Sequence, residues 1–308
     1  MISIVIPLYN KKKQIANTLQ TVFNQTFQNF EIVIVNDGSS DRSVEEVEKF
    51  KDSRIRLIHQ ENAGVSAARN RGIQESQYDL IAFLDADDEW KPDYLQTQYE
   101  LSKKYPECSV FACNYEFKNT NGEIKPTIIR KLQFSEPDGI FNNYFETASC
   151  SHPPLWTSAV MVKKEAILSM GGFPVGVKAG EDLLTWARLA NKYSIAFNRN
   201  SLAIFNAPEN IKNRMPRLDI YKDVVHDELV KLHHKNTKIK GIKKYIARWN
   251  EMRVSVFIQN GNRLKAFIPL FRVIKYRGTY KKILYFFILI ASPVRFQNYI
   301  NKIKEKWF

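Results

Sequence analysis

Four aspartates in this sequence are spaced in a way that suits the binding of a metal-bound phosphate compound. Asp85, Asp87 and Asp88 lie within four residues at the end of an apolar run, and Asp37 follows another apolar run. Clustered carboxylates repel one another, which raises their pKa values unless a cation neutralises them. Mg²⁺ and Mn²⁺ prefer oxygen ligands and usually keep water and substrate phosphates in their remaining positions. The residues therefore predict a metal-assisted phosphate site.

The same acids also have a purely structural explanation. Acidic side chains are favoured near the start of a helix, and a helix is expected soon after Pro92, while Asn36-Asp37-Gly38 is typical of a turn. Against this stands the position of Asp85, which directly follows the apolar run Leu80–Leu84. In open parallel α/β sheets, ligands bind beyond the carboxyl ends of the strands. This position favours a binding site.

Short β-branched runs alternate with amphipathic helical patterns over the first hundred residues, which predicts βαβ units and a largely parallel sheet. We expect strands at Ile2–Pro7, Glu31–Asn36, Arg54–His59 and Leu80–Leu84, and helices at Ile15–Phe23 and Ser66–Glu75. Further along, we expect a helix after Pro92, strands at Ser109–Phe117 and Ala159–Val162, and a helix at Glu181–Asn191. The predicted fold class is α/β, with a mostly parallel central sheet flanked by helices.

Charge divides the chain into two regions. The formal net charge is +14 over 308 residues, but residues 1–205 carry 23 basic and 25 acidic residues, whereas residues 206–308 carry 23 and 7. We therefore predict a domain at 1–210 that holds the acidic motifs and a basic helical region at 211–308. No zinc-finger or RNP sequence accompanies the charge, so nucleic acid is not an expected partner. Basic helices with interspersed apolar residues favour peripheral binding to an anionic membrane; a solvated surface and a homo-oligomer interface are the alternatives.

The most apolar stretch of the basic region, Ile283–Val294, holds 12 uncharged residues. A membrane-spanning helix needs about 20, so we expect this stretch to lie at a membrane surface. Lys282 and Arg295 flank it, and the terminal segment Lys302–Phe308 adds further positive charge.

The cysteines and the N-terminal run indicate in which cellular compartment the protein is expected. The three cysteines form no CxxC pair, which argues against a zinc site or a disulfide framework and favours a reducing environment. Lysines follow the apolar N-terminal run instead of preceding it, so we expect a buried strand there and no signal peptide. The expected location is cytoplasmic, peripheral on the inner face of the cell membrane.

Five motifs, taken in order, resemble the signature of family 2 glycosyltransferases with the GT-A fold. They are Ile4–Asn10, Val33–Asp41, Asn62–Gly72, Phe83–Trp90 and Gly180–Leu184. Their order and spacing make the resemblance specific over roughly residues 1–205, and the basic region lies outside it. The resemblance implies inverting transfer of a sugar from a nucleotide diphosphate donor, usually a UDP-sugar, with Mn²⁺ or Mg²⁺ as the cofactor.

The resemblance also implies roles for residues on the nucleotide side of the site. Pro7 and Tyr9 match positions that line the nucleoside pocket, and Asp37 matches the acid that hydrogen-bonds the base. Arg69 matches an arginine that helps to hold the nucleotide, and Asp85 matches the acid that lies against the ribose and phosphates.

Asp87 matches the family's metal ligand and Asp182 its catalytic base, while Asp88 is an extra acid whose role stays open. The chemistry itself needs a cation to neutralise the departing diphosphate and a base on the opposite side of the anomeric carbon. Because Asp182 stands at the start of a predicted helix, we expect its carboxylate to be ionised at neutral pH. Simple capping of that helix is the structural alternative. Glu181 is expected to orient the acceptor or a neighbouring side chain.

The acceptor side is less clearly marked. Phe205–Asn210 holds no histidine of the kind that some family members use as a further metal ligand, so the third ligand stays open. The chain also has no Gln-x-x-Arg-Trp motif, which accompanies polymerising members. Together with the expected absence of membrane-spanning helices, this favours addition of a single sugar, and the expected acceptor is a lipid-linked saccharide. Trp156 is expected either to stack on an acceptor sugar or to pack in the core, and His152 to be hydrogen-bonded in a loop.

Two other functions compete with sugar transfer. A phosphatase-like hydrolase of the haloacid dehalogenase class also uses an apolar strand ending in Asp-x-Asp, but on its first strand and with Thr or Val at the position of Asp88. A non-catalytic, membrane-bound binding module has no need for Asp85, Asp87 and Asp182 together. The lack of a G-x-G-x-x-G sequence argues against a dinucleotide-dependent oxidoreductase. The lack of glycine in Ile6–Asn10 argues against a nucleotidyltransferase.

Overall fold

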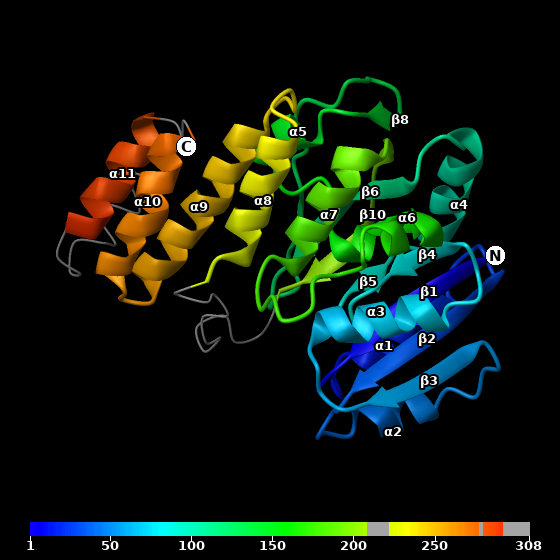
Figure 1. Cartoon of the computed structure of the whole chain (residues 1–308). Coiled ribbons are helices and arrows are strands. Elements are labelled where there is room, and N and C mark those ends of the chain that lie inside the picture. Colours follow the sequence, from blue (N-terminus) through cyan, green and yellow to red (C-terminus); the bar gives the residue numbers. More distant parts are fainter. Residues whose placement is uncertain (208–221, 277–279, 292–308) are drawn as a thin grey trace. The chain divides into compact units, whose positions relative to one another are not determined.

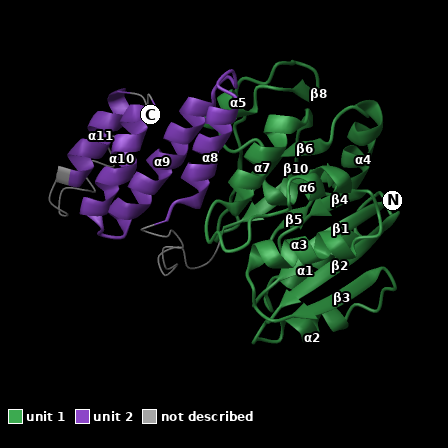
Figure 2. Ribbon diagram, viewed as in Figure 1, with its two compact units in different colours: residues 1–213 green, residues 214–308 purple. Residues whose placement is uncertain are grey.

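The computed structural model describes residues 1–207, 222–276 and 280–291. The chain forms two compact units, Met1–Asn213 and Arg214–Phe308 (Figure 2). The domain boundary predicted after residue 210 lies outside the described residues.

The N-terminal unit is built on one sheet, to which ten strands belong within the described residues. The strands are β1 (Ile2–Leu8), β2 (Phe30–Asp37), β3 (Ile55–Gln60), β4 (Leu80–Phe83), β5 (Glu89–Trp90), β6 (Val110–Lys118), β7 (Ile124–Pro126), β8 (Asp138–Phe141), β9 (Val160–Lys163) and β10 (Ile195–Asn206). Their order is β3-β2-β1-β4-β9-β6-β10-β5, with β7 paired to β6 and β8 to β10. Strands β3, β2, β1 and β4 run parallel, as β6 and β10 also do, and β9 is antiparallel to both its neighbours.

Helices cover both faces of this sheet (Figure 1). They are α1 (Ile15–Phe23), α2 (Ser43–Glu48), α3 (Val65–Glu75), α4 (Tyr94–Lys104), α5 (Tyr144–Cys150), α6 (Lys164–Ser169) and α7 (Glu181–Lys192). The predicted α/β class is confirmed. The helices α2, α5 and α6 and the strands β5, β7, β8 and β10 were not predicted.

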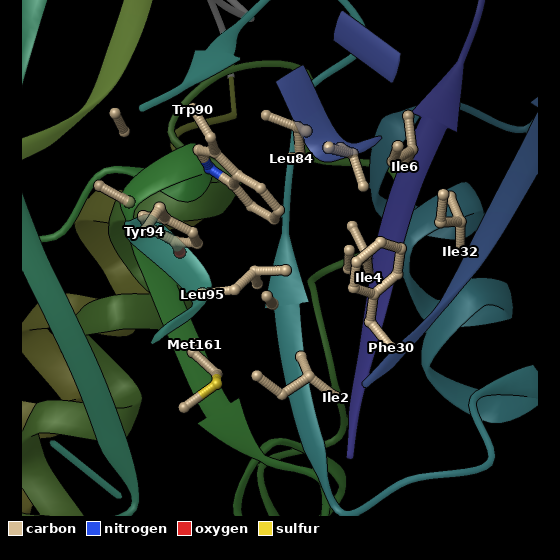
Figure 3. Close-up of a cluster of buried hydrophobic side chains, with 14 of the residues drawn as sticks. Ile2, Ile4, Ile6, Phe30, Ile32, Leu84, Trp90, Tyr94, Leu95 and Met161 are labelled. Carbon is tan, nitrogen blue, oxygen red and sulfur yellow. The ribbon is translucent and has the colours of Figure 1, made fainter. Parts of the chain in front are cut away.

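Successive side chains of β1 point to opposite faces of the sheet, and both faces are covered by helices. Its side chains at Ile2, Ile4 and Ile6 enter a large core with residues of α1 and α4 (Figure 3). The intervening Val5 faces α3, where the backbone of Gly72 approaches so closely that a Cβ there would lie 2.4 Å from Val5 Cγ1. Gly72 therefore allows α3 to pack against β1.

The C-terminal unit is helical in its described residues, with α8 (Val224–Lys235), α9 (Ile242–Gln259), α10 (Phe267–Lys275) and α11 (Tyr280–Ala291). A buried carboxylate, Asp223, caps α8 by accepting the His226 N–H (3.0 Å) and pairs with Arg253 of α9 (2.9 Å) and Arg272 of α10 (3.1 Å). It therefore links three helices.

The predicted apolar stretch at 283–294 is helical as far as Ala291. The rest of that stretch, Arg295 and the terminal basic segment lie outside the described residues. Among the described residues, no helix combines the length and the hydrophobicity needed to cross a bilayer.

Candidate active site

Three neighbouring parallel strands bring the predicted site residues to one edge of the sheet. In the register, Leu8 at the end of β1 lies opposite Asn36 of β2, and Val5 lies opposite Phe83 at the end of β4. Asp37 is the last residue of β2, and Asp85 follows β4 by two residues. The acids therefore come from different strands but share the carboxyl edge, where ligands of such sheets bind.

The loops after β1 and β2 are held together by hydrogen bonds. Asn10 has a left-handed backbone (φ 52°), and its side-chain carbonyl accepts the Ser40 N–H at 2.8 Å. The Lys11 N–H donates to Ser43 Oγ at 2.7 Å. Tyr9 directly precedes Asn10 in the loop after β1, and 49% of its surface is exposed. Its ring is therefore accessible to a ligand at this edge.

Asp37 is engaged by the protein itself. Its carboxylate accepts hydrogen bonds from Gln60 Nε2 (2.7 Å) and from the backbone N–H groups of Ala63 and Gly64 (both 2.9 Å). These contacts hold the segment that leads into α3. A carboxylate has about four acceptor positions, so Asp37 keeps capacity for one more donor, and its expected bond to a nucleotide base stays a prediction.

Arg69 links the acids after β4 to those that begin α7. Its buried guanidinium donates to Asp85 at 2.7 Å and lies 3.5 Å from a carboxylate oxygen of Glu181. The Phe173 ring packs against it, 5.1 Å from the ring centroid to Cζ. Burial opposes its charge, but Asp85 and Glu181 raise the pKa of Arg69. Its Nε is buried and makes no hydrogen bond, and its Nη1 is buried beside Glu181.

Asp87 forms an ion pair with Lys11, which comes from the loop after β1. Both side chains are partly accessible, at 23% for Asp87 and 29% for Lys11. Within the described residues, no group of three or more His, Cys, Asp or Glu side chains is arranged to hold a metal ion. Mg²⁺ is commonly bound by one or two carboxylates together with substrate phosphates. Asp87 fits such a cation if the ligand supplies the remaining oxygens.

Asp88 points away from Asp87 into the protein. Its carboxylate accepts the Ser158 hydroxyl at 2.5 Å and the Asn206 N–H at 3.2 Å. Burial, followed by the charges of Asp85 and Asp87, raises its pKa well above the usual range. The role that the sequence left open is therefore structural: Asp88 fastens the acidic loop to the segment before β9 and to the end of β10.

Asp182 lies in the first turn of α7, where its carboxylate accepts the Leu183 N–H at 2.7 Å. Desolvation, and next the charge of Glu181, raises the pKa of Asp182 to about 7, although Arg69 acts in the opposite direction. This pKa differs from the expectation that the helix start keeps Asp182 ionised at neutral pH, because desolvation and the charge of Glu181 disfavour the ionised form. A carboxyl with a pKa near neutrality suits a general base.

The aromatic residues near this edge pack on one another. Trp156 stacks on Tyr115, with ring centroids 5.4 Å apart, and contacts Phe205 at 4.8 Å. His152 accepts the Ile128 N–H at 3.0 Å through Nδ1. These contacts favour core packing for Trp156 and the hydrogen-bonded loop position for His152.

Three residues of this site escaped the sequence reasoning. Lys11 is one of three consecutive lysines, and nothing in the sequence distinguishes it from Lys12 and Lys13. The fold brings its ammonium into an ion pair with Asp87. Ser158 and Asn206 stand 70 and 118 positions from Asp88 along the chain. Asn206 also donates from its side chain to the Asp87 carbonyl at 2.8 Å. Long-range contacts of this kind leave no local pattern.

Comparisons with known proteins agree with one another. Residues 3–165 match the model of glycosyl transferase family 2. The glycosyltransferase GlyA of Streptococcus pneumoniae serotype 4 is 33% identical over 186 residues, covering 59% of this chain and 27% of GlyA. EpsH of Bacillus subtilis (strain 168) is 36% identical over 149 residues, covering 47% of this chain and 43% of EpsH. The matches thus span less than half the length of these relatives.

A solved structure of S. aureus TarS, residues 1–349 in complex with UDP-GlcNAc, superposes with a TM-score of 0.69. It covers 99% of this chain and 91% of that chain at 16% sequence identity. At this identity the likeness shows the fold alone.

Proposed function

The chain belongs to glycosyltransferase family 2, and from this premise we propose that it transfers one sugar from a UDP-sugar to a saccharide acceptor with inversion at the anomeric carbon. The observation that carries the proposal is the position of Arg69. Its guanidinium pairs with Asp85 on the nucleotide side and lies beside Glu181 at the start of α7. The same contacts bring the proposed base, Asp182, into the electrostatic range of the proposed donor site.

The proposed reaction begins with removal of a proton. Asp182 accepts the proton of the acceptor hydroxyl, and the oxygen attacks the anomeric carbon from the face opposite the diphosphate. The bond between that carbon and the diphosphate oxygen breaks, and UDP leaves with the bonding electrons. Arg69, held between Asp85 and Glu181, supplies positive charge on the proposed nucleotide side of the site. When bound, Mn²⁺ or Mg²⁺ supplies positive charge to the leaving diphosphate.

Asp87 is the proposed ligand for that cation. Because Lys11 pairs with Asp87, its ammonium would compete with a divalent cation for the carboxylate. This competition would favour binding of the cation together with the diphosphate, because substrate phosphates commonly supply part of the ligands of Mg²⁺. Lys11 would then be a second positive charge available to the diphosphate.

The donor and acceptor classes rest on separate observations. A UDP-sugar is supported by the accessible ring of Tyr9 next to Pro7, by the acceptor capacity left on Asp37, and by the TarS complex with UDP-GlcNAc. The proposed acceptor is a lipid-linked saccharide at the inner face of the cell membrane, used in assembly of a surface polysaccharide or glycan. The excess of basic residues in the segment 206–308 supports this choice, because such segments are attracted to anionic lipids.

Binding and release assays with a panel of nucleotide sugars test the proposal. With Mn²⁺ present, calorimetry should detect one UDP-sugar as a ligand, and Asp87→Ala should weaken that binding. Asp182→Asn should keep donor binding and lower transfer by about a hundredfold or more, because it removes the base. Lack of binding by every donor, or donor binding indifferent to Asp87→Ala, would overturn the assignment. Release of inorganic phosphate in place of UDP would point to the hydrolase alternative.

A further inference from the structure

Two helices of the C-terminal unit expose apolar side chains outside their own core. Leu264, just before α10, is 83% exposed, and Phe271 on α10 is 63% exposed. On α11, Phe287 is 38% exposed. We name this surface the α10–α11 face; it comprises Leu264, Ile268, Phe271, Ile274, Leu284, Phe287 and Ile288.

The opposite sides of both helices are also apolar. Leu270 of α10 and Phe286 and Leu289 of α11 are buried in the core of the unit. Helix α10 also carries Arg272 and Lys275, but α11 has no charged residue from Ile283 to Ala291. A helix that is apolar on nearly all sides is ordinarily covered all round. The α10–α11 face therefore has the composition of a surface that binds something.

Exposed aromatic residues of the two helices are connected through one side chain. Phe267 lies between them, with its ring centroid 6.5 Å from that of Phe271 and 6.4 Å from that of Phe287. The helices lie side by side in Figure 1 and share one core. Exposed contiguous apolar patches mark sites of protein or membrane interaction.

Charge distinguishes between these two kinds of partner. Residues 263–275 and 280–291 contain no acidic residue, but they contain six basic ones: Arg263, Lys265, Arg272, Lys275, Lys281 and Lys282. Arg272 and Lys282 pair inward, with Asp223 and Glu251. Lys275 and Lys281 are exposed. Lysine is depleted in protein interfaces, whereas lysines beside an apolar helix face suit anionic lipid headgroups.

We propose that the α10–α11 face binds the surface of an anionic bilayer, with its apolar side chains among the acyl chains and Lys275 and Lys281 at the lipid phosphates. The inference rests on the membrane attachment in the proposed function and assigns it to a surface. Four residues of the predicted apolar stretch, Tyr285, Phe286, Leu289 and Ile290, lie in the core of the unit. Helix α10 therefore supplies part of the binding face.

Vesicle co-sedimentation of the full chain tests the apolar part. Native protein should bind phosphatidylcholine vesicles that contain phosphatidylglycerol and should not bind phosphatidylcholine alone. The double variant Ile268→Ser, Phe271→Ser should bind about tenfold or more weakly, because each side chain no longer contributes apolar area. Val175→Ser, which changes an equally exposed residue (62%) of the other unit, is the matched control and should bind like the native chain.

A second pair of variants tests the charged part. Lys275→Gln with Lys281→Gln should weaken binding about fivefold for each lysine, since one basic residue near an anionic surface is worth about that factor. The control Lys238→Gln changes an exposed lysine between α8 and α9 and should weaken binding less. All of these side chains are exposed, so the thermal unfolding temperature should be unchanged.

Three results would overturn the inference. The first is absence of binding by the native chain, and the second is binding that neither double variant weakens. The third is a native dimer in sedimentation velocity that Ile268→Ser, Phe271→Ser converts to monomer, because the face would then be an interface between copies. Donor binding by calorimetry is read separately, so failure of the membrane inference is distinguishable from failure of the proposed sugar transfer.

Discussion

Replacement of Glu181 by glutamine should lower the pKa of Asp182. After desolvation, the Glu181 charge is the largest cause that raises the pKa of Asp182 to about 7. Glutamine keeps the size of the side chain and removes its charge. The substitution also removes the carboxylate that lies 3.5 Å from Arg69, whose positive charge already lowers the pKa of Asp182. Both effects act in the same direction.

The expected size follows from the fraction of Asp182 that is ionised. With a pKa of about 7, roughly a tenth of the carboxyls are ionised at pH 6 and roughly nine tenths at pH 8. A reaction that needs ionised Asp182 should therefore slow about tenfold between pH 8 and pH 6. If Glu181→Gln lowers the pKa by about one unit, equivalent to about 1.4 kcal/mol, the same change of pH should slow the reaction only about twofold.

Carbon NMR of the aspartate side chains measures this titration without knowledge of either substrate, and Asp182→Asn identifies the resonance. UDP release over the same pH range gives the matching rate profile. Glu45→Gln removes an acid of α2 whose side chain is 62% exposed, and as a control it should leave both curves unchanged. An Asp182 resonance that titrates near pH 4, or one that Glu181→Gln does not move, refutes the reasoning.

Two further substitutions test other contacts. Lys11→Gln should strengthen Mn²⁺ binding in the absence of nucleotide about fivefold, as measured by calorimetry, because a partly exposed ion pair contributes about 1 kcal/mol. The control Lys12→Gln should leave Mn²⁺ affinity unchanged. Equal Mn²⁺ affinities of the native chain and Lys11→Gln would contradict competition between Lys11 and the cation at Asp87. Gly72→Ala should lower the free energy of unfolding in urea by about 1–2 kcal/mol, because overpacking against Val5 costs more than the gain in helix propensity. Adding Val5→Ala should relieve part of this loss. Unchanged stability of Gly72→Ala would contradict the close approach of α3 to β1.

The first four strands were predictable because their chemistry is local. A strand buried on both faces is a continuous apolar run, and β1, β2 and β4 follow that pattern to within about two residues of the expected ends. Asp37 and Asp85 then fall at the carboxyl edge by the rules of parallel sheets. In contrast, Arg199 and Asn200 interrupt β10, and its pairing with β6 shifts register between Asn198 and Ser201. The irregularity removes the alternation by which a strand is recognised.

The ionisation of Asp182 illustrates what local reasoning misses. The position in the first turn of α7 is visible in the sequence, and it favours the charged form. Desolvation by the surrounding fold and the paired charges of Glu181 and Arg69 depend on tertiary structure. These effects decide the pKa, so the direction could not be predicted from helix position.

The three acids after β4 also change the argument for a metal. Repulsion among them suggested that a cation must neutralise the cluster, yet the fold neutralises each acid separately. Asp85 pairs with Arg69, Asp87 pairs with Lys11, and burial favours the protonated form of Asp88. The cluster by itself therefore does not require a metal. In the proposed reaction, the diphosphate of the donor would add negative charge that Lys11 and Arg69, already paired with acids, do not fully balance. We therefore expect Mn²⁺ or Mg²⁺ to bind tightly only together with the nucleotide.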